Sequence, residues 1–79
     1  MLRDVEYNKN VKTKIKGSAN EFACCASCAA EPSCEAWSWE PPGDAGAAAA
    51  CHLIWPVEGV SAKKKKGWFA AVRGQARLA

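Results

Sequence analysis

The sequence has 79 residues, of which 49% are hydrophobic, a composition typical of a folded globular chain rather than a disordered one. This length corresponds to one domain that buries only about 60 to 65% of its unfolded surface, so disulfides, a metal or partner contacts are expected to add stability. The net charge is +3 and four positive charges are consecutive, at Lys63, Lys64, Lys65 and Lys66. Nucleic-acid-binding proteins spread Lys and Arg over a face, whereas here the positive charge is one short run, so nucleic acid is not the expected partner.

The segment from Asp4 to Ile15 predicts one or two short, half-buried strands. It places apolar residues among charged ones, namely Val5, Tyr7, Val11 and Ile15.

A helix is predicted from about Ala19 to Ala30. Ser18 followed three residues later by Glu21 forms a capping box before an Ala-rich run. The helix is expected to end before Pro32, which lacks a backbone N–H.

Helical periodicity places the cysteines of this segment on different stripes. Cys24 and Cys28 are one turn apart on one stripe, and a second stripe holds Phe22, Ala26 and Ala29. Cys24 and Cys28 are therefore expected to bond outward from the helix, and Cys25, which lies between the stripes, to pack against the core.

The segment CEAWSWE, residues 34–40, alternates as a strand does. We expect Cys34, Ala36 and Ser38 to face the helix, because their small size leaves room for it. Trp37 and Trp39 are then expected on the opposite face of the sheet, partly exposed.

The rest of the chain alternates between loops and short apolar runs. PPGDAGAAAA (41–50) predicts a loop, and Cys51–Trp55 a strand that ends at Pro56. The lysine run is expected in a solvated loop before a strand over GWFAAVRG, residues 67–74. The tail QARLA, residues 75–79, is expected to be frayed.

Zinc is one interpretation of the cysteine cluster. The available ligands are Cys25, Cys28, Cys34, Cys51 and His52, but a structural zinc site normally uses two close pairs. Cys51 and His52 are adjacent, so in a strand they point to opposite faces. A redox pair, Cys25 and Cys28, is a second interpretation, but it lacks a βαβ context and a basic neighbour.

A disulfide framework is the interpretation that the spacing favours. Cys28 is close enough to bridge Cys34 across the turn, and Cys24 can reach Cys51 on the next strand. The sequence alone leaves the connectivity open. One of the five cysteines must remain unpaired in the chain, and in this scheme it is Cys25.

The chain resembles the PAN/Apple modules over nearly its whole length. The motifs that carry the resemblance are SANEFACCASCAAEPSCEAWSW, the Cys51 motif ACHLIW and the closing KKKKGWFAAVRG. It implies an α+β fold, in which a small antiparallel sheet cradles one helix, as a single module over residues 1–79 with a core of about 4–74. It also implies the disulfides Cys24–Cys51 and Cys28–Cys34. The chain departs from the fuller modules in its extra Cys25 and in lacking their terminal cysteine pair.

The resemblance implies a non-catalytic binding module for proteins or carbohydrates outside the cytosol, one unit of a larger chain. No enzyme activity and no cofactor are expected, since His52 has no nucleophile or carboxylate at a recognisable spacing. The location would be an oxidising one, with the targeting segment removed or outside this sequence, because cytosolic thiols stay reduced. The sequence has no apolar run of the roughly 20 residues that span a bilayer.

Two sets of residues are the candidates for ligand binding. Aromatic faces suit sugars and protein hot spots, and Trp37, Trp39 and Trp55 are the aromatic candidates. Lys63, Lys64, Lys65 and Lys66 suit an acidic partner such as a sulfated polysaccharide, an acidic protein or the anionic surface of a membrane. The alternative function is a structural connector within a larger complex, with the tryptophans buried at a fixed interface.

Overall fold

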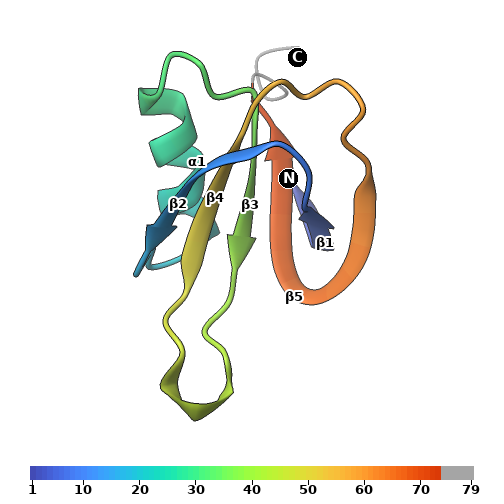
Figure 1. Ribbon diagram of the computed structural model, residues 1–79. Coiled ribbons are helices and arrows are strands. Elements are labelled where there is room, and N and C mark those ends of the chain that lie inside the picture. The colour runs from blue at the N-terminus through green and yellow to red at the C-terminus, as the bar shows by residue number, and fades with distance from the viewer. Residues whose placement is uncertain (74–79) are drawn as a thin grey trace.

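The computed structural model describes residues 1–73, except for the side chain of Asp44. The elements are β1 (Leu2–Tyr7), β2 (Val11–Lys16), α1 (Glu21–Ala30), β3 (Ala36–Glu40), a short 3-10 turn (Asp44–Gly46), β4 (Ala50–Ile54) and β5 (Ala62–Val72). The strands form one antiparallel sheet in the order β1-β5-β3-β4-β2 (Figure 1). The predicted α+β fold, with one helix on a small disulfide-linked sheet, is confirmed.

One face of the sheet packs against α1 and forms the larger core. Directly paired residues share a face of a sheet, and Trp37 pairs with Leu53 and Ala71 across three adjacent strands. All three are buried with Cys24 and Cys28 of the helix. Large side chains on the sheet and small ones on the helix therefore allow close contact between the two layers.

The opposite face of the sheet is covered by the chain itself. Tyr7, at the end of β1, lies over β3: its N–H donates to the Ser38 hydroxyl (2.7 Å), which donates in turn to the Tyr7 carbonyl (3.1 Å). Tyr7 forms a second buried cluster with Ala36, Ile54 and Ala70. From there the chain crosses to the far edge of the sheet, where β2 begins (Figure 1). Both faces of the central strands are consequently internal.

A bulge bends the ribbon formed by β1 and β5. Arg3 pairs with Phe69 and Val5 with Lys64, so Asp4 alone opposes the four residues 65–68. Asp4 and Gly67 both have positive φ, 58° and 85°, a region that costs glycine little. The Gly67 N–H donates to Asp4 Oδ1 (2.8 Å), which fixes the bulge. This bend allows the second half of β1 to fold over the sheet.

The helix begins later than the sequence predicts and has a different N-cap. Asn20 is the N-cap, and its side chain accepts from the Ala23 N–H (2.8 Å). Ser18, the predicted cap, is buried, and its hydroxyl has no hydrogen-bond partner. The Ser18 carbonyl accepts from Trp39 Nε1 (3.0 Å). Ser18 is thus held against the sheet, outside the helix, and the capping-box prediction is wrong.

The predicted facing of β3 is also wrong. The strand begins at Ala36, so the alternation of Cys34 and Glu35 does not continue into it. Cys34 belongs to the turn after α1, where its N–H donates to the Glu31 carbonyl (3.0 Å). Within β3 it is Trp37 and Trp39 that face the helix, whereas Ala36 and Ser38 face Tyr7.

The last strand is longer than predicted. β5 begins at Ala62 and includes the lysine run, so the run is not a loop: Lys63 and Lys64 pair with β1, and Lys65 and Lys66 lie in the bulge. Gly74, the last residue of the predicted strand, and the tail 75–79, which was expected to be frayed, lie outside the described residues.

Candidate functional site

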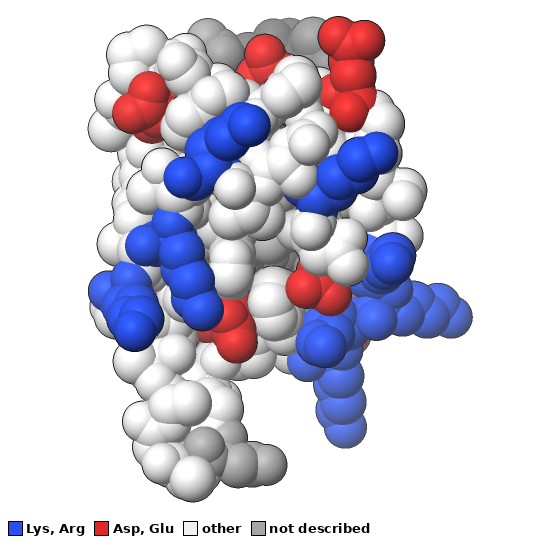
Figure 2. All heavy atoms as spheres, in the orientation of Figure 1, with Lys and Arg blue, Asp and Glu red and all other residues white. Residues whose placement is uncertain are grey.

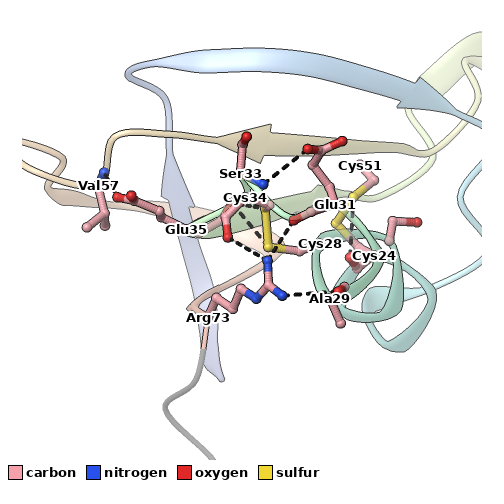
Figure 3. Close-up of a disulfide and its surroundings, with 12 residues drawn as sticks. Cys24, Cys28, Ala29, Glu31, Ser33, Cys34, Glu35, Cys51, Val57 and Arg73 are labelled. Atoms are coloured by element: carbon pink, nitrogen blue, oxygen red, sulfur yellow. Dashed lines mark hydrogen bonds between the residues drawn. A yellow bond between two sulfur atoms is a disulfide. The ribbon is translucent and has the colours of Figure 1, made fainter.

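Two disulfides join the helix to its surroundings. Cys24 bonds to Cys51 of β4, and Cys28 bonds to Cys34 in the turn before β3 (Figure 3), each with a Cα–Cα distance of 5.3 Å. These are the pairs implied by the resemblance. Zinc binding by the cluster is excluded in this state, because three of its candidate ligands are in disulfides. Residues 1–73 contain no other group of three or more potential metal ligands.

Cys25 is free and exposed on the outer side of α1. The expectation that it packs against the core is wrong. Its neighbours on the chain explain why: Cys24 occupies the sheet-facing position, and one residue corresponds to 100° around a helix, so Cys25 turns away from the sheet.

The tryptophans do not form a binding surface. Trp37 is 1% exposed and Trp39 8% exposed, both beneath the helix, so the expectation that they lie partly exposed on the opposite face is wrong. Trp55 is half-buried and packs against the same core. Large rings fill the space between the sheet and a helix of small residues, so Trp37 and Trp39 have little surface left for a ligand.

The four lysines of the run are all exposed and extend from the pairing part of β5 into the bulge. Lys63 and Lys64 pair with Glu6 and Val5 of β1, and Lys65 and Lys66 lie in the bulge. Figure 2 shows Lys and Arg side chains around the lower bend of β5, some of which project away from the body of the molecule. The bend therefore presents a local concentration of positive charge.

A row of side chains supports the base of this bend. Lys65 Nζ lies 5.8 Å from the centre of the Trp68 ring. His52 of β4 stacks on Trp68 with 5.5 Å between ring centres, and His52 Nε2 lies 3.0 Å from Glu40 Oε1. The sequence suggests no role for this row, because its members are far apart in the chain and meet only when β3, β4 and β5 pair.

A second set of lysines, which the sequence analysis did not single out, lies on β2. Lys12, Lys14 and Lys16 are exposed at alternate positions of VKTKIK. Lys14 of β2 pairs with His52 of β4, so Lys14 shares the face of the sheet that carries the Trp68–His52 stack. The strand alternation of this segment was the signal that could have identified them.

Arg73 fixes the end of β5 to the end of the helix (Figure 3). Its Nη1 donates to the carbonyls of Glu31 (2.6 Å) and Cys34 (3.1 Å), and Nη2 donates to that of Ala29 (3.2 Å). The Arg73 N–H also donates to the Glu35 carbonyl (2.8 Å). The last carbonyls of a helix lack intrahelical partners and carry partial negative charge, so a guanidinium is well suited to this position.

A family model described as PAN domain matches residues 6–54, which span β1 to β4 and all four disulfide cysteines. The chain belongs to the PAN domain family. PAN domains are non-catalytic modules that bind proteins or carbohydrates. No curated protein and no solved structure matches the chain.

The family match covers the disulfide-linked part of this PAN domain and not its last strand. The matched residues include both disulfides, whereas β5, with the lysine run and Arg73, lies beyond them. In the described part of the chain no helix is long and apolar enough to cross a membrane. The charged strand β5 and its bulge therefore lie outside the residues that the family model matches.

Proposed function

We propose that this PAN domain is a non-catalytic module that binds a sulfated polysaccharide through Lys63, Lys64, Lys65 and Lys66. The observation that carries the proposal is the exposure of four consecutive lysines on a strand and bulge that the Gly67–Asp4 hydrogen bond holds in place. Asp4 is the nearest acidic residue to the bulge by strand pairing, and its Oδ1 accepts this bond. Glu6 is the cross-strand neighbour of Lys63 and offsets part of its charge, so Lys64, Lys65 and Lys66 are the ammonium groups most available to an external anion.

The geometry suits a linear polyanion better than a small molecule. Successive residues of a strand advance about 3.3 Å and point to opposite faces, so Lys63 and Lys64 present charge on both sides, and Lys65 and Lys66 extend this charge into the bulge. Sulfates along a polysaccharide can contact such a ridge from outside without a deep pocket. Each lysine near an anionic surface contributes about 1 kcal/mol, and the attraction falls within a Debye length of about 8 Å at physiological salt.

The Trp68–His52 stack gives the ridge a firm base. Lys65 lies over the outer part of Trp68, and Trp68 is half-buried against His52. Cation–π contact of this kind restricts the lysine side chain before a ligand arrives. Less conformational entropy is then lost on binding.

The proposal includes an extracytoplasmic location, with the module as one unit of a larger chain. The two disulfides support this, because disulfides form and persist in oxidising compartments. Sulfated polysaccharides and acidic glycans are accessible to a protein there.

The test is a comparison of two matched variants on immobilised heparin, with unsulfated dextran as the neutral control. One variant changes Lys63, Lys64, Lys65 and Lys66 to Gln, and the other changes Lys9, Lys12, Lys14 and Lys16 to Gln. Both lose the same charge. We expect the first to lose most of its retention and the second to keep most of it. Equal losses would mean that net charge alone causes binding, and no retention of the unmodified domain would refute the proposal.

The connector hypothesis loses its main support. It required tryptophans buried at an interface with a partner, whereas Trp37 and Trp39 are buried within the chain. The exposed residues of β5 favour a soluble, charged ligand instead.

A further inference from the structure

We propose that the outer edge of β2 is a second binding site, which accepts an extended segment of a partner protein with alternating acidic and apolar side chains. β2 is the last strand in the sheet order and pairs on one side with β4 (Figure 1). Within residues 1–73, no strand pairs with its other side. An edge of this kind carries backbone donors and acceptors that a further strand can use.

The two faces of β2 have different chemistry. Ile15 pairs with Cys51, whose disulfide reaches α1, so Ile15 lies on the helix side of the sheet. Lys14 pairs with His52 and Lys16 with Ala50, on the other side. A strand added beside β2 would find lysines at every second position on one face, and on the other Ile15 and Leu53 beside the polar Thr13.

A groove with mixed apolar and polar lining lies on the helix side, between β2 and α1. Its volume is about 330 Å³, and it is lined by Thr13, Ile15, Ser27, Ala30, Glu31 and Leu53. The helix leaves it open because both disulfides draw α1 toward β4 and the start of β3, and because its residues facing β2 are small. Side chains that point inward from an added strand would enter this groove.

These two surfaces define the partner. Residues of the added strand opposite Lys14 and Lys16 would be acidic, since opposite charges stabilise a cross-strand pair and like charges destabilise it. The residues between them would be apolar and small enough for the groove. A second copy of β2 does not fit, because its own lysines would oppose these. The site is separate from the lysine ridge of β5, because β3 and β4 lie between β2 and β5 in the sheet.

The probe is a synthetic peptide in which Glu and Val alternate over seven residues, titrated into the intact domain while backbone amide signals of β2 are followed by NMR. We expect saturable shifts in β2 and at the groove. A peptide of the same composition with its Glu and Val in separate blocks should bind at least tenfold more weakly. N-methylation of alternate peptide amides on the hydrogen-bonding side should abolish binding.

Two variants test the two surfaces separately. Lys14→Glu combined with Lys16→Glu should reverse the preference, so that a Lys/Val peptide binds better than the Glu/Val peptide. Ala30→Phe, which fills the groove from the exposed end of the helix, should weaken binding at least tenfold with an unchanged Tm. The variant with Lys63, Lys64, Lys65 and Lys66 changed to Gln should bind the peptide as before.

The proposal is overturned if the Glu/Val peptide produces no saturable shifts at millimolar concentration. It is also overturned if the block peptide binds equally well, or if the charge reversal leaves the peptide preference unchanged. Shifts confined to β5 would show that the peptide behaves as a general polyanion.

Discussion

Replacement of Arg73 by Met should destabilise the domain by about 2 kcal/mol. The guanidinium donates to three carbonyls at 2.6 to 3.2 Å in the last turn of α1 and the turn that follows. Hydrogen bonds to charged groups contribute roughly 1.5 to 3 kcal/mol when they are well protected, and less where water can replace the donor. Ala29 is exposed, so its carbonyl can be rehydrated, whereas Cys34 is buried. The estimate is therefore well below the sum of three protected bonds.

This loss is large relative to the whole domain. At about 0.05 to 0.15 kcal/mol per residue, a chain of this length is stable by roughly 4 to 12 kcal/mol. Urea unfolding should show a lower midpoint at an unchanged m-value, and Tm should fall by roughly 10 °C. Arg73→Lys should recover part of the loss, because it keeps a positive charge at the helix C-terminus but cannot reproduce the planar fork.

The matched control is Lys12→Met, which removes an exposed positive charge from β2 and should change stability by less than about 0.5 kcal/mol. If Arg73→Met were no more destabilising than this control, the role assigned to Arg73 in holding β5 to the helix would be wrong.

Three further predictions concern the interior. Replacement of both Cys24 and Cys51 by Ala should cost about 3.5 kcal/mol and replacement of Cys28 and Cys34 about 2.2 kcal/mol, since their separations are 27 and 6 residues. Non-reducing urea unfolding in which the second pair proved costlier would contradict this ranking. Ser38→Ala should cost about 3 kcal/mol, because it leaves the Tyr7 N–H and carbonyl unpaired in the interior. The control is Ser33→Ala, at an exposed turn, and an equal loss of stability in the two variants would show that Tyr7 finds other partners. Burial raises the pKa of the Tyr7 phenol above its ordinary value of 10.0, so its contribution to stability is constant below pH 10 and is lost as pH rises through the raised pKa. Tyr7→Phe should therefore make the free energy of unfolding less dependent on pH above 10. An unchanged dependence would assign the effect to other groups.

The helix and its cysteine pattern were predictable because the signals are local. Pro32 marks the end of the helix, and the four-residue spacing of Cys24 and Cys28 places them on one face. The N-cap was misassigned because Ser18 and Asn20 are both good caps, and the choice between them depends on the distant Trp39, whose indole binds the Ser18 carbonyl.

The tryptophan prediction failed because of one strand boundary. The expected alternation starts at Cys34, which must reach the helix, but Cys34 and Glu35 precede β3, which begins at Ala36. The pleat of a strand says which residues share a face, and not which face is covered. Bulky Trp37 and Trp39 fill the space under the small helix residues, an outcome that depends on the packing of both layers.

Long-range features could not be read from the sequence at all. The lysine run resembles a loop because four consecutive charges have no alternation, yet Lys63 and Lys64 pair with β1. Pairing between the first and the last strand, the bulge at Asp4 and the Arg73 contacts all join residues more than 35 positions apart. None of these leaves a periodic or local signal.

The salt dependence of heparin affinity tests the central claim most directly. Measured by calorimetry between low and physiological salt, the affinity of the unmodified domain should fall steeply as salt rises, because ion pairs with the lysines of β5 supply most of the binding energy. The variant with Lys63, Lys64, Lys65 and Lys66 changed to Gln should bind weakly with little salt dependence. The variant with Lys9, Lys12, Lys14 and Lys16 changed to Gln should retain the steep fall. If the β5 variant kept both the affinity and the salt dependence of the unmodified domain, the ridge would not be the polysaccharide site.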